Sequence, residues 1–197
     1  NLSGANLNGA DLREAYLRDV NAAGADFTNA QLGNADLTRA DLTEAVFRDA
    51  DLTLATLDVA RVARSDFANA LMAGVHMSKA RGTGANFQRA MLSAANLSQS
   101  VFVEANFAEA NLGGRGQGHP GPNGAILRGT DFSGADLSKA NLVNAKLNQA
   151  ILKNTDLRGA KMGFADLSWS RADDANFADA DMGWVRAYAA GMKRAGF

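Results

Sequence analysis

Hydrophobic residues recur at every fifth position along the whole chain, and the stretch ADLTRADLTEAVFRDADL (residues 35–52) shows the pattern clearly. We call the 40 positions from Leu2 to Phe197 in steps of five the centres, and 34 of them are Leu, Phe, Met or Val. Alanine lies two residues before the centre at 29 of 39 sites. One short unit is therefore repeated in tandem along the chain.

A period of five fits neither a regular helix nor a flat strand. Five residues advance an α-helix by about 500°, so successive centres would wind around the whole cylinder. Five is also odd, so successive centres of a strand would point to opposite faces. The pattern instead predicts a chain that turns a corner once per repeat, which describes a solenoid of short β-segments.

The repeat unit resembles the motif of the pentapeptide-repeat family, roughly Ala-(Asp/Asn)-Leu-x-x. The units ADLTR at Ala35, ANLSQ at Ala95 and ADLSK at Ala135 carry the resemblance, which extends over essentially the whole chain. It implies an all-β fold, a right-handed, four-sided parallel β-helix whose centres and preceding small residues face inward. It implies little about function, because members of the family share a shape rather than a chemistry.

The spacing of centre types supports four repeats per turn. Five phenylalanines lie twenty residues apart and would form one column: Phe27, Phe47, Phe67, Phe87 and Phe107. The small centres Ala22, Val62 and Gly82 also differ by multiples of twenty, so we expect them in a second column. Large and small side chains sorted in this way predict a densely filled core.

The segment GGRGQGHPGPNG, Gly113 to Gly124, interrupts the pattern and holds both prolines of the chain. Such a composition is typical of a loop. Either two repeats are replaced, or about ten residues are extruded while the coil continues, as the solenoid register favours. Extrusion returns Phe177 and Phe197 to the phenylalanine column. We therefore predict nine to ten coils in a single domain, residues 1–197, with a loop at 113–124.

The composition limits which partners and which cellular compartment the sequence suggests. The chain has 20 basic and 21 acidic residues, which gives no electrostatic argument for direct binding to nucleic acid or membrane. It has no cysteine and no apolar run that approaches a membrane span. Because it begins in register at Asn1, we expect a segment of a longer protein. The family's distribution suggests the bacterial cytoplasm and leaves a secreted effector role open.

No residues indicate catalysis, a metal or a cofactor. Eleven of the 21 acids lie just before a centre, where short side chains suit turns. His76 is expected to be solvated, whereas Arg115 and His119 lie in the predicted loop and are candidates for contact with a partner. The chain is therefore not expected to be an enzyme.

Outward positions on one side of the predicted rod collect apolar residues, with two aromatic residues around the next corner. These candidates for partner binding are Leu54, Leu71, Met91, Val143, Phe164, Trp169, Trp184 and Tyr188. A contiguous apolar patch usually marks an interface, and aromatic residues often dominate its energetics.

The prediction is a non-catalytic protein-interaction or scaffold module, with a homodimer through the C-terminal coils as its simplest form. The alternative comes from the resemblance, since some pentapeptide-repeat proteins mimic DNA, bind DNA gyrase and protect it from quinolones. Mimicry of duplex DNA calls for a long acidic face. Residues 1–66 carry a net charge of −5, but residues 67–130 carry +3 and residues 131–197 carry +1.

Overall fold

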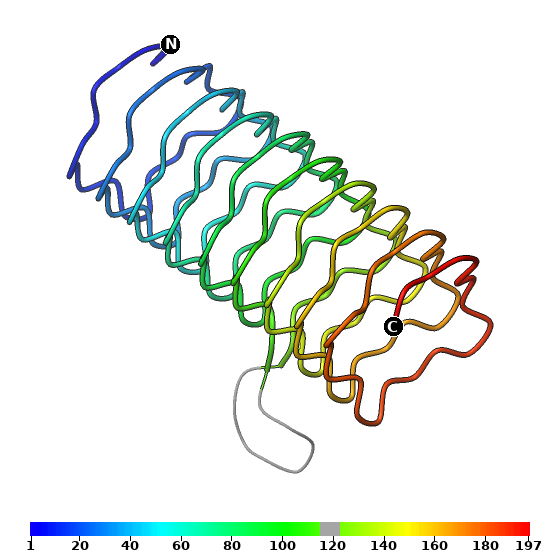
Figure 1. The fold of residues 1–197 in the computed structure, drawn as a ribbon. Helices are drawn as coiled ribbons and strands as arrows, with labels where there is room; N and C mark the ends of the chain where they lie inside the picture. Colours follow the sequence, from blue (N-terminus) through cyan, green and yellow to red (C-terminus); the bar gives the residue numbers. More distant parts are fainter. Residues whose placement is uncertain (115–122) are drawn as a thin grey trace.

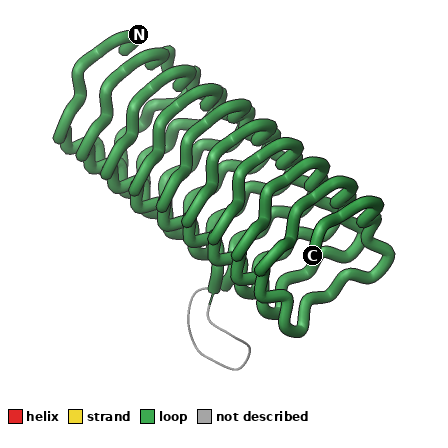
Figure 2. Tube along the Cα trace, viewed as in Figure 1, coloured by secondary structure: helices red, strands yellow, loops and turns green. Residues whose placement is uncertain are grey.

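The computed structural model of the chain describes residues 1–114 and 123–197. These residues form a rod of stacked coils, with the two termini at opposite ends (Figure 1). They contain no helix and no strand longer than one bridged residue, so the backbone is drawn as loop throughout (Figure 2). The regular structure consists of single parallel bridges between neighbouring coils.

The bridges fix four repeats to a coil. They join residues twenty apart, such as Asn6 with Asp26 and Asp26 with Val46. Four successive bridges, beginning with Asn96 to Ile126, join residues thirty apart, and the spacing of twenty then resumes. The register therefore advances by ten extra residues across the part of the chain that is not described, and the columns continue beyond it.

Each repeat turns its corner with the same hydrogen bonds. The N–H of Ala35 donates to the carbonyl of Leu32 at 2.9 Å, which closes a four-residue turn. The third residue of that turn, Asn34, has a φ of 58°, in the left-handed region. The side chain before the centre supports this type of turn, as in the repeat of Phe27, where Asp26 Oδ1 accepts the N–H of Thr28 at 2.9 Å. The abundant Asp and Asn before the centres are thus explained by turn structure.

Hydrogen bonds between coils run along the rod. The N–H of Leu32 donates to the carbonyl of Asp51 at 2.6 Å in the next coil, and the N–H of Asp51 donates back to Ala30 at 2.9 Å. The turn adds a third bond of 3.0 Å from Asn34 to Thr53. Each coil therefore depends mainly on its two neighbours, as in other solenoids.

The core consists of columns of centres with alanine beside them. Phe27 and Phe47 stack at a centroid distance of 4.6 Å, and the column continues through Phe67, Phe87 and Phe107. Beyond the register change, Phe177 and Phe197 stack at 5.5 Å. Each buried leucine centre contributes roughly 1.5–3 kcal/mol by burial.

The expectation of a separate column of small centres is wrong in part. The bridge register puts Phe102 and Phe132 in the column of Val62 and Gly82. A Cβ added to Gly82 would lie 2.5 Å from the Phe102 ring and 3.0 Å from Val62. Gly82 thus leaves room for the ring in the next coil, so large and small residues share one column.

Serine or threonine in place of the inner alanine adds a hydrogen bond between coils. The buried hydroxyls of Ser65 and Thr155 donate to the carbonyls of Leu42 and Phe132 at 2.7 and 2.8 Å, centres of the preceding coil. The equally buried hydroxyl of Ser170 has no hydrogen-bond partner among the described residues. An unpaired buried hydroxyl destabilises a fold.

We expect Ser170→Ala to raise the free energy of unfolding by about 1 kcal/mol, because alanine removes an unpaired polar group. Denaturant unfolding followed by circular dichroism measures the change. The control, Ser65→Ala, removes a hydrogen bond that is made and should leave stability unchanged or lower it. An equal loss of stability in both variants would contradict the assignment.

Carboxylates in the turns are held in their charged form. The hydrogen bond from the Arg13 side chain lowers the pKa of Asp11 to about 2, and the Thr38 hydroxyl lowers the pKa of Asp36. The pKa is lowered in the same way for Asp19, Asp26, Asp41, Glu109, Asp156 and Asp174. Since these pKa values are lower in the folded than in the unfolded chain, they stabilise the fold above about pH 4, the unfolded pKa.

Stability should therefore fall as the pH drops below about 4 through the lowered folded pKa values, and change little between pH 5 and 7. Thermal unfolding followed by circular dichroism across this range measures the effect. The triple variant Asp26→Asn, Asp36→Asn and Asp41→Asn keeps the acceptor atoms without the titration, so its acid dependence should be shallower. An equally steep acid loss in this variant would assign the effect to other groups.

Candidate functional site

Most of the exposed apolar residues lie on two adjacent sides of the rod, at the corner between these sides and at the corner that follows them along the chain. The bridged residues of side three are Asp11, Gln31, Asp51, Leu71, Met91, Asn111, Asn141, Lys161 and Asp181. Those of side four, which follows along the chain, are Tyr16, Asp36, Thr56, His76, Asn96, Ile126, Lys146, Asp166 and Arg186.

Each corner is a column of turns, named here by its left-handed residues. The corner between sides three and four, the loop corner, has Glu14, Asn34, Leu54, Gly74, Ala94, Asn144, Phe164 and Trp184. The corner after side four, the far corner, has Asp19, Arg39, Val59, Lys79, Gln99, Gly129, Gln149, Trp169 and Ala189. We call side four with these two corners the aromatic face.

The predicted apolar residues of the N-terminal half lie on side three and the loop corner. Leu71 and Met91 bridge each other and are 48% and 41% exposed. Leu54 covers Gly74 of the next coil, since a Cβ on that glycine would lie 2.7 Å from Leu54 Cδ2. Exposed leucine and methionine thus come together near the middle of the rod.

The C-terminal candidates form two aromatic pairs. Phe164 and Trp184 stack at the loop corner with their ring centroids 6.4 Å apart and their planes nearly parallel. Trp169 and Tyr188 meet edge to face at the far corner, 5.3 Å apart. Val143 does not join either pair; it is half-buried, and its N–H donates to Asn141 Oδ1 in the same turn. The pairs therefore stand on the two edges of side four.

The sequence interpretation missed two exposed residues of the aromatic face. Tyr16 lies on side four and is 90% exposed, and Val59 lies at the far corner. The same sorting by register that found the other candidates would have found both. With them included, the exposed apolar surface centres on side four rather than on side three. Val101 stands apart on side one, the side after the far corner, whose bridged residues begin with Asn21, Asp41, Arg61, Arg81 and Val101.

Among the described residues, bulky apolar side chains occupy left-handed turn positions only at the two corners of this face. Leu54, Val59, Phe164, Trp169 and Trp184 have φ between 58° and 63°. At the remaining two corners, the left-handed residues of the described coils are all glycine or polar. Side chains branched at Cβ or bulky are disfavoured in this conformation. Turn formation therefore does not explain why these residues are present.

The segment Gly113 to Gly124 begins and ends at the loop corner. The N–H of Ala125 donates to the carbonyl of Leu112 at 2.7 Å, a bond that elsewhere joins a centre carbonyl to the N–H of the residue three positions later. On either side of the insertion, Gly114 N–H donates to Val143 at 2.8 Å and Ala94 N–H donates to Asn123 at 2.9 Å. The candidates Arg115 and His119 lie outside the described residues.

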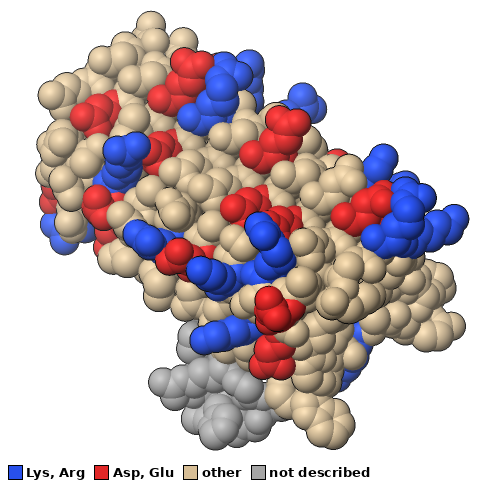
Figure 3. Space-filling model, viewed as in Figure 1, with Lys and Arg blue, Asp and Glu red and all other residues tan. Residues whose placement is uncertain are grey.

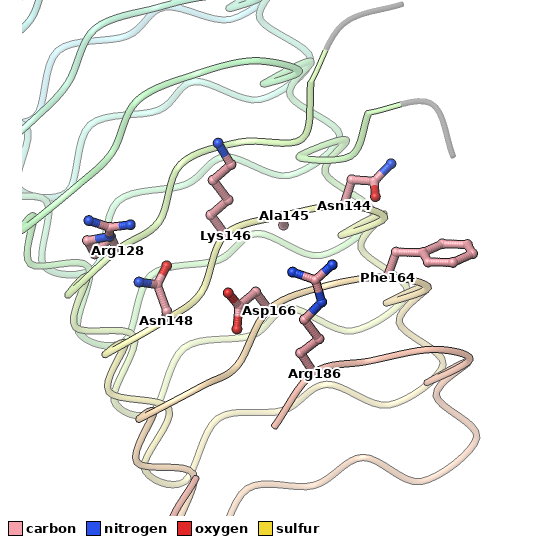
Figure 4. A pocket seen from close by; sticks show the side chains of 8 residues that line it. All are labelled: Arg128, Asn144, Ala145, Lys146, Asn148, Phe164, Asp166 and Arg186. Atoms are coloured by element: carbon pink, nitrogen blue, oxygen red, sulfur yellow. The ribbon is translucent and has the colours of Figure 1, made fainter. Parts of the chain in front are cut away.

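A shallow cavity of about 290 Å³ opens on side four beside Phe164 (Figure 4). It is lined by Arg128, Asn144, Ala145, Lys146, Asn148, Phe164, Asp166 and Arg186. The bridges order three of these along the rod as Lys146, Asp166 and Arg186 in successive coils. Cations thus outnumber carboxylates around the cavity.

Acidic and basic residues are interspersed on the face visible in Figure 3, without a continuous acidic stripe. Much of the acidic charge is met by arginine, as where Arg39 pairs with Asp19 at 2.6 Å and Arg64 pairs with Glu44 at 2.7 Å in neighbouring coils. In residues 1–114 and 123–197, no three His, Cys, Asp or Glu side chains lie close enough together to hold a metal. The same residues include no helix able to cross a membrane.

The sequence profile of the family described as pentapeptide repeats matches the chain in eight copies. The matched residues are 1–32, 23–58, 63–99, 88–114, 123–154 and 150–186. A search of curated protein sequences gives no match.

Solved structures with similar folds include QnrB1, a plasmid-mediated fluoroquinolone resistance protein, in its full-length form. It is 15% identical with a TM-score of 0.61, over 95% of this chain and 91% of that chain. HetL, a pentapeptide repeat protein involved in heterocyst differentiation regulation from the cyanobacterium Nostoc sp. strain PCC 7120, is 26% identical over 94% of this chain and 86% of that chain, with a TM-score of 0.36. The likeness to QnrB1 concerns the fold alone.

We expect Val59→Asn to raise the free energy of unfolding by about 1 kcal/mol, because asparagine adopts the left-handed conformation more readily than valine. Denaturant unfolding measures the change. The reverse substitution at a polar corner, Asn69→Val, is the matched control and should destabilise the rod by a similar amount. If Val59→Asn destabilises the rod instead, packing by the valine outweighs its backbone strain.

Proposed function

The chain belongs to the pentapeptide-repeat family, and we propose that it is a non-catalytic interaction module that presents its aromatic face to a protein partner. One observation carries the proposal: bulky apolar residues stand exposed in left-handed turns at the two corners of that face and at neither of the other corners. Such residues add nothing to the turn, and exposed aromatic side chains are typical anchors of interfaces.

The rigidity of the rod supports the proposal. The bonds between coils hold the aromatic pairs on the two edges of side four, with the cavity beside Phe164. A preformed surface loses little conformational entropy on binding. The proposal also includes Arg115 and His119, which lie outside the described residues, as contacts with the partner.

The proposal has two further parts, which concern the oligomeric state and the cellular compartment. A homodimer through the C-terminal coils would bury Phe164 and Trp184 of both copies against each other, as a two-fold interface does. We place the module in the bacterial cytoplasm, which rests on the family resemblance alone. Catalysis is not part of the proposed role.

Partner capture by the full chain tests the proposed face. A variant with Phe164→Asn and Trp169→Gln should lose the proteins that the unaltered chain retains, because it removes one anchor from each corner while keeping residues suited to the turns. Quantitative mass spectrometry of the retained proteins measures the loss, and circular dichroism checks the fold. Val101→Gln on side one is the control. Equal retention by all three chains would rule out the aromatic face.

Binding to DNA gyrase by mimicry of DNA is the second candidate, and the likeness in fold to QnrB1 favours it. The interspersed charges of Figure 3 and the carboxylates paired with arginine speak against it. Gyrase supercoiling measured with and without a fluoroquinolone separates the two roles. Inhibition or drug protection that is lost on deletion of residues 113–124 would favour this candidate; no effect at micromolar protein would leave the interaction module.

A further inference from the structure

Three cations that form no ion pair with the described residues line the cavity on side four. Nine of the thirteen arginines in the described part of the chain form ion pairs with carboxylates. Arg128 and Arg186 form none, and neither does Lys146, although all three line the same cavity. Their side chains are exposed, so they are available to a ligand.

The single carboxylate of the cavity does not neutralise these cations. Asp166 lies between Lys146 and Arg186 in the ladder of side four, and one of its oxygens, Oδ1, accepts the N–H of Ser168 at 2.9 Å. Neither cation forms an ion pair with it. Two coils separate Lys146 from Arg186, about 10 Å along the rod at the usual strand spacing. The cavity therefore offers positive charge at separated points along one line.

Apolar surface borders these charges on both edges. Phe164 lines the cavity itself and stacks on Trp184, while Trp169 and Tyr188 form the opposite edge at the far corner. Figure 4 shows the Arg186 side chain between Asp166 and Phe164. A ligand lying along side four would meet cations in the middle and aromatic rings at its margins.

We infer that this cavity binds an acidic segment of the partner protein, an extended peptide whose carboxylates face Lys146 and Arg186 and whose apolar side chains lie on the aromatic corners. The inference rests on the proposed function and adds the chemistry of the partner. Charge complementarity supports it, because carboxylates would supply counter-ions for three cations that line one cavity and form no ion pair within the described part of the chain.

A nucleic acid fits the same surface less well. The cations occupy only the C-terminal coils, and side four continues toward the N-terminus with Asn96, His76, Thr56 and Asp36. Proteins that bind single strands carry a positively charged groove along the backbone of the nucleic acid. The short basic stretch favours a peptide with a few carboxylates.

Fluorescence anisotropy of the full chain tests the inference with a defined probe. The probe is a short fluorescein-labelled peptide of Asp, Glu, Leu and Trp, and its counterpart carries Asn and Gln in place of the acids. We expect the acidic peptide to bind, its affinity to fall with added salt, and the neutral peptide to bind at least about tenfold more weakly. Absence of binding by the acidic peptide, or equal binding of both, would overturn the inference.

Charge reversal locates the site. The double variant Lys146→Glu and Arg186→Glu should weaken binding of the acidic peptide at least about tenfold. The matched control, Lys153→Glu and Arg171→Glu, makes the same change in net charge on side one and the corner after it. An equal loss in both variants would assign binding to net charge and overturn the site.

The remaining outcomes separate this inference from the proposed function. Tighter binding of a labelled oligothymidine than of the acidic peptide would overturn it in favour of a nucleic acid. A concentration-dependent dimer that excludes the peptide and is unaffected by the charge reversal would overturn it in favour of a second copy. If the acidic peptide does not bind while the variant with Phe164→Asn and Trp169→Gln still loses the captured proteins, the inference of an acidic partner segment is overturned and the proposed function stands.

Discussion

The whole rod depends on one left-handed residue per repeat. A chain that rises straight along a strand cannot return to the same face after five residues, so each repeat must turn a corner. The turn closed by the centre carbonyl, with φ near 60° at its third residue, makes that corner. Once the corners are fixed, the backbone groups of the straight segments point along the axis and bond to the adjacent coils.

Because of this constraint, the positions of a repeat have different structural roles. The centre and the preceding alanine fill the interior, the Asp or Asn before the centre binds the turn, and two turn residues face solvent. Only the last group is free to vary with function. Bulky residues in left-handed turns are therefore informative in this fold, since the backbone there favours glycine and asparagine.

The sequence alone predicted the solenoid, the four repeats per coil and the continuation of the register beyond residue 124. These follow because the period and the columns of phenylalanine are properties of the chain itself. It did not predict that Phe102 fills the space above Gly82, since that contact joins centres of two coils whose sizes are complementary. Nor did the sequence distinguish Val143, whose N–H is bonded within its turn, from Trp184, whose side chain is exposed. The cavity beside Phe164 was also missed, because it is formed by residues from several coils that are far apart in sequence.

Because the bridges join residues twenty apart, equivalent positions recur at a fixed interval along the rod. Each coil adds one step of about 4.8 Å without rotating one side relative to the next, apart from the gradual twist of the ladder. Duplication or loss of a coil between Leu71 and Phe164 would change the separation of two contact points by whole steps and leave both on their own sides. A lineage of such proteins can thus be matched to partners of different length by changes in repeat number alone.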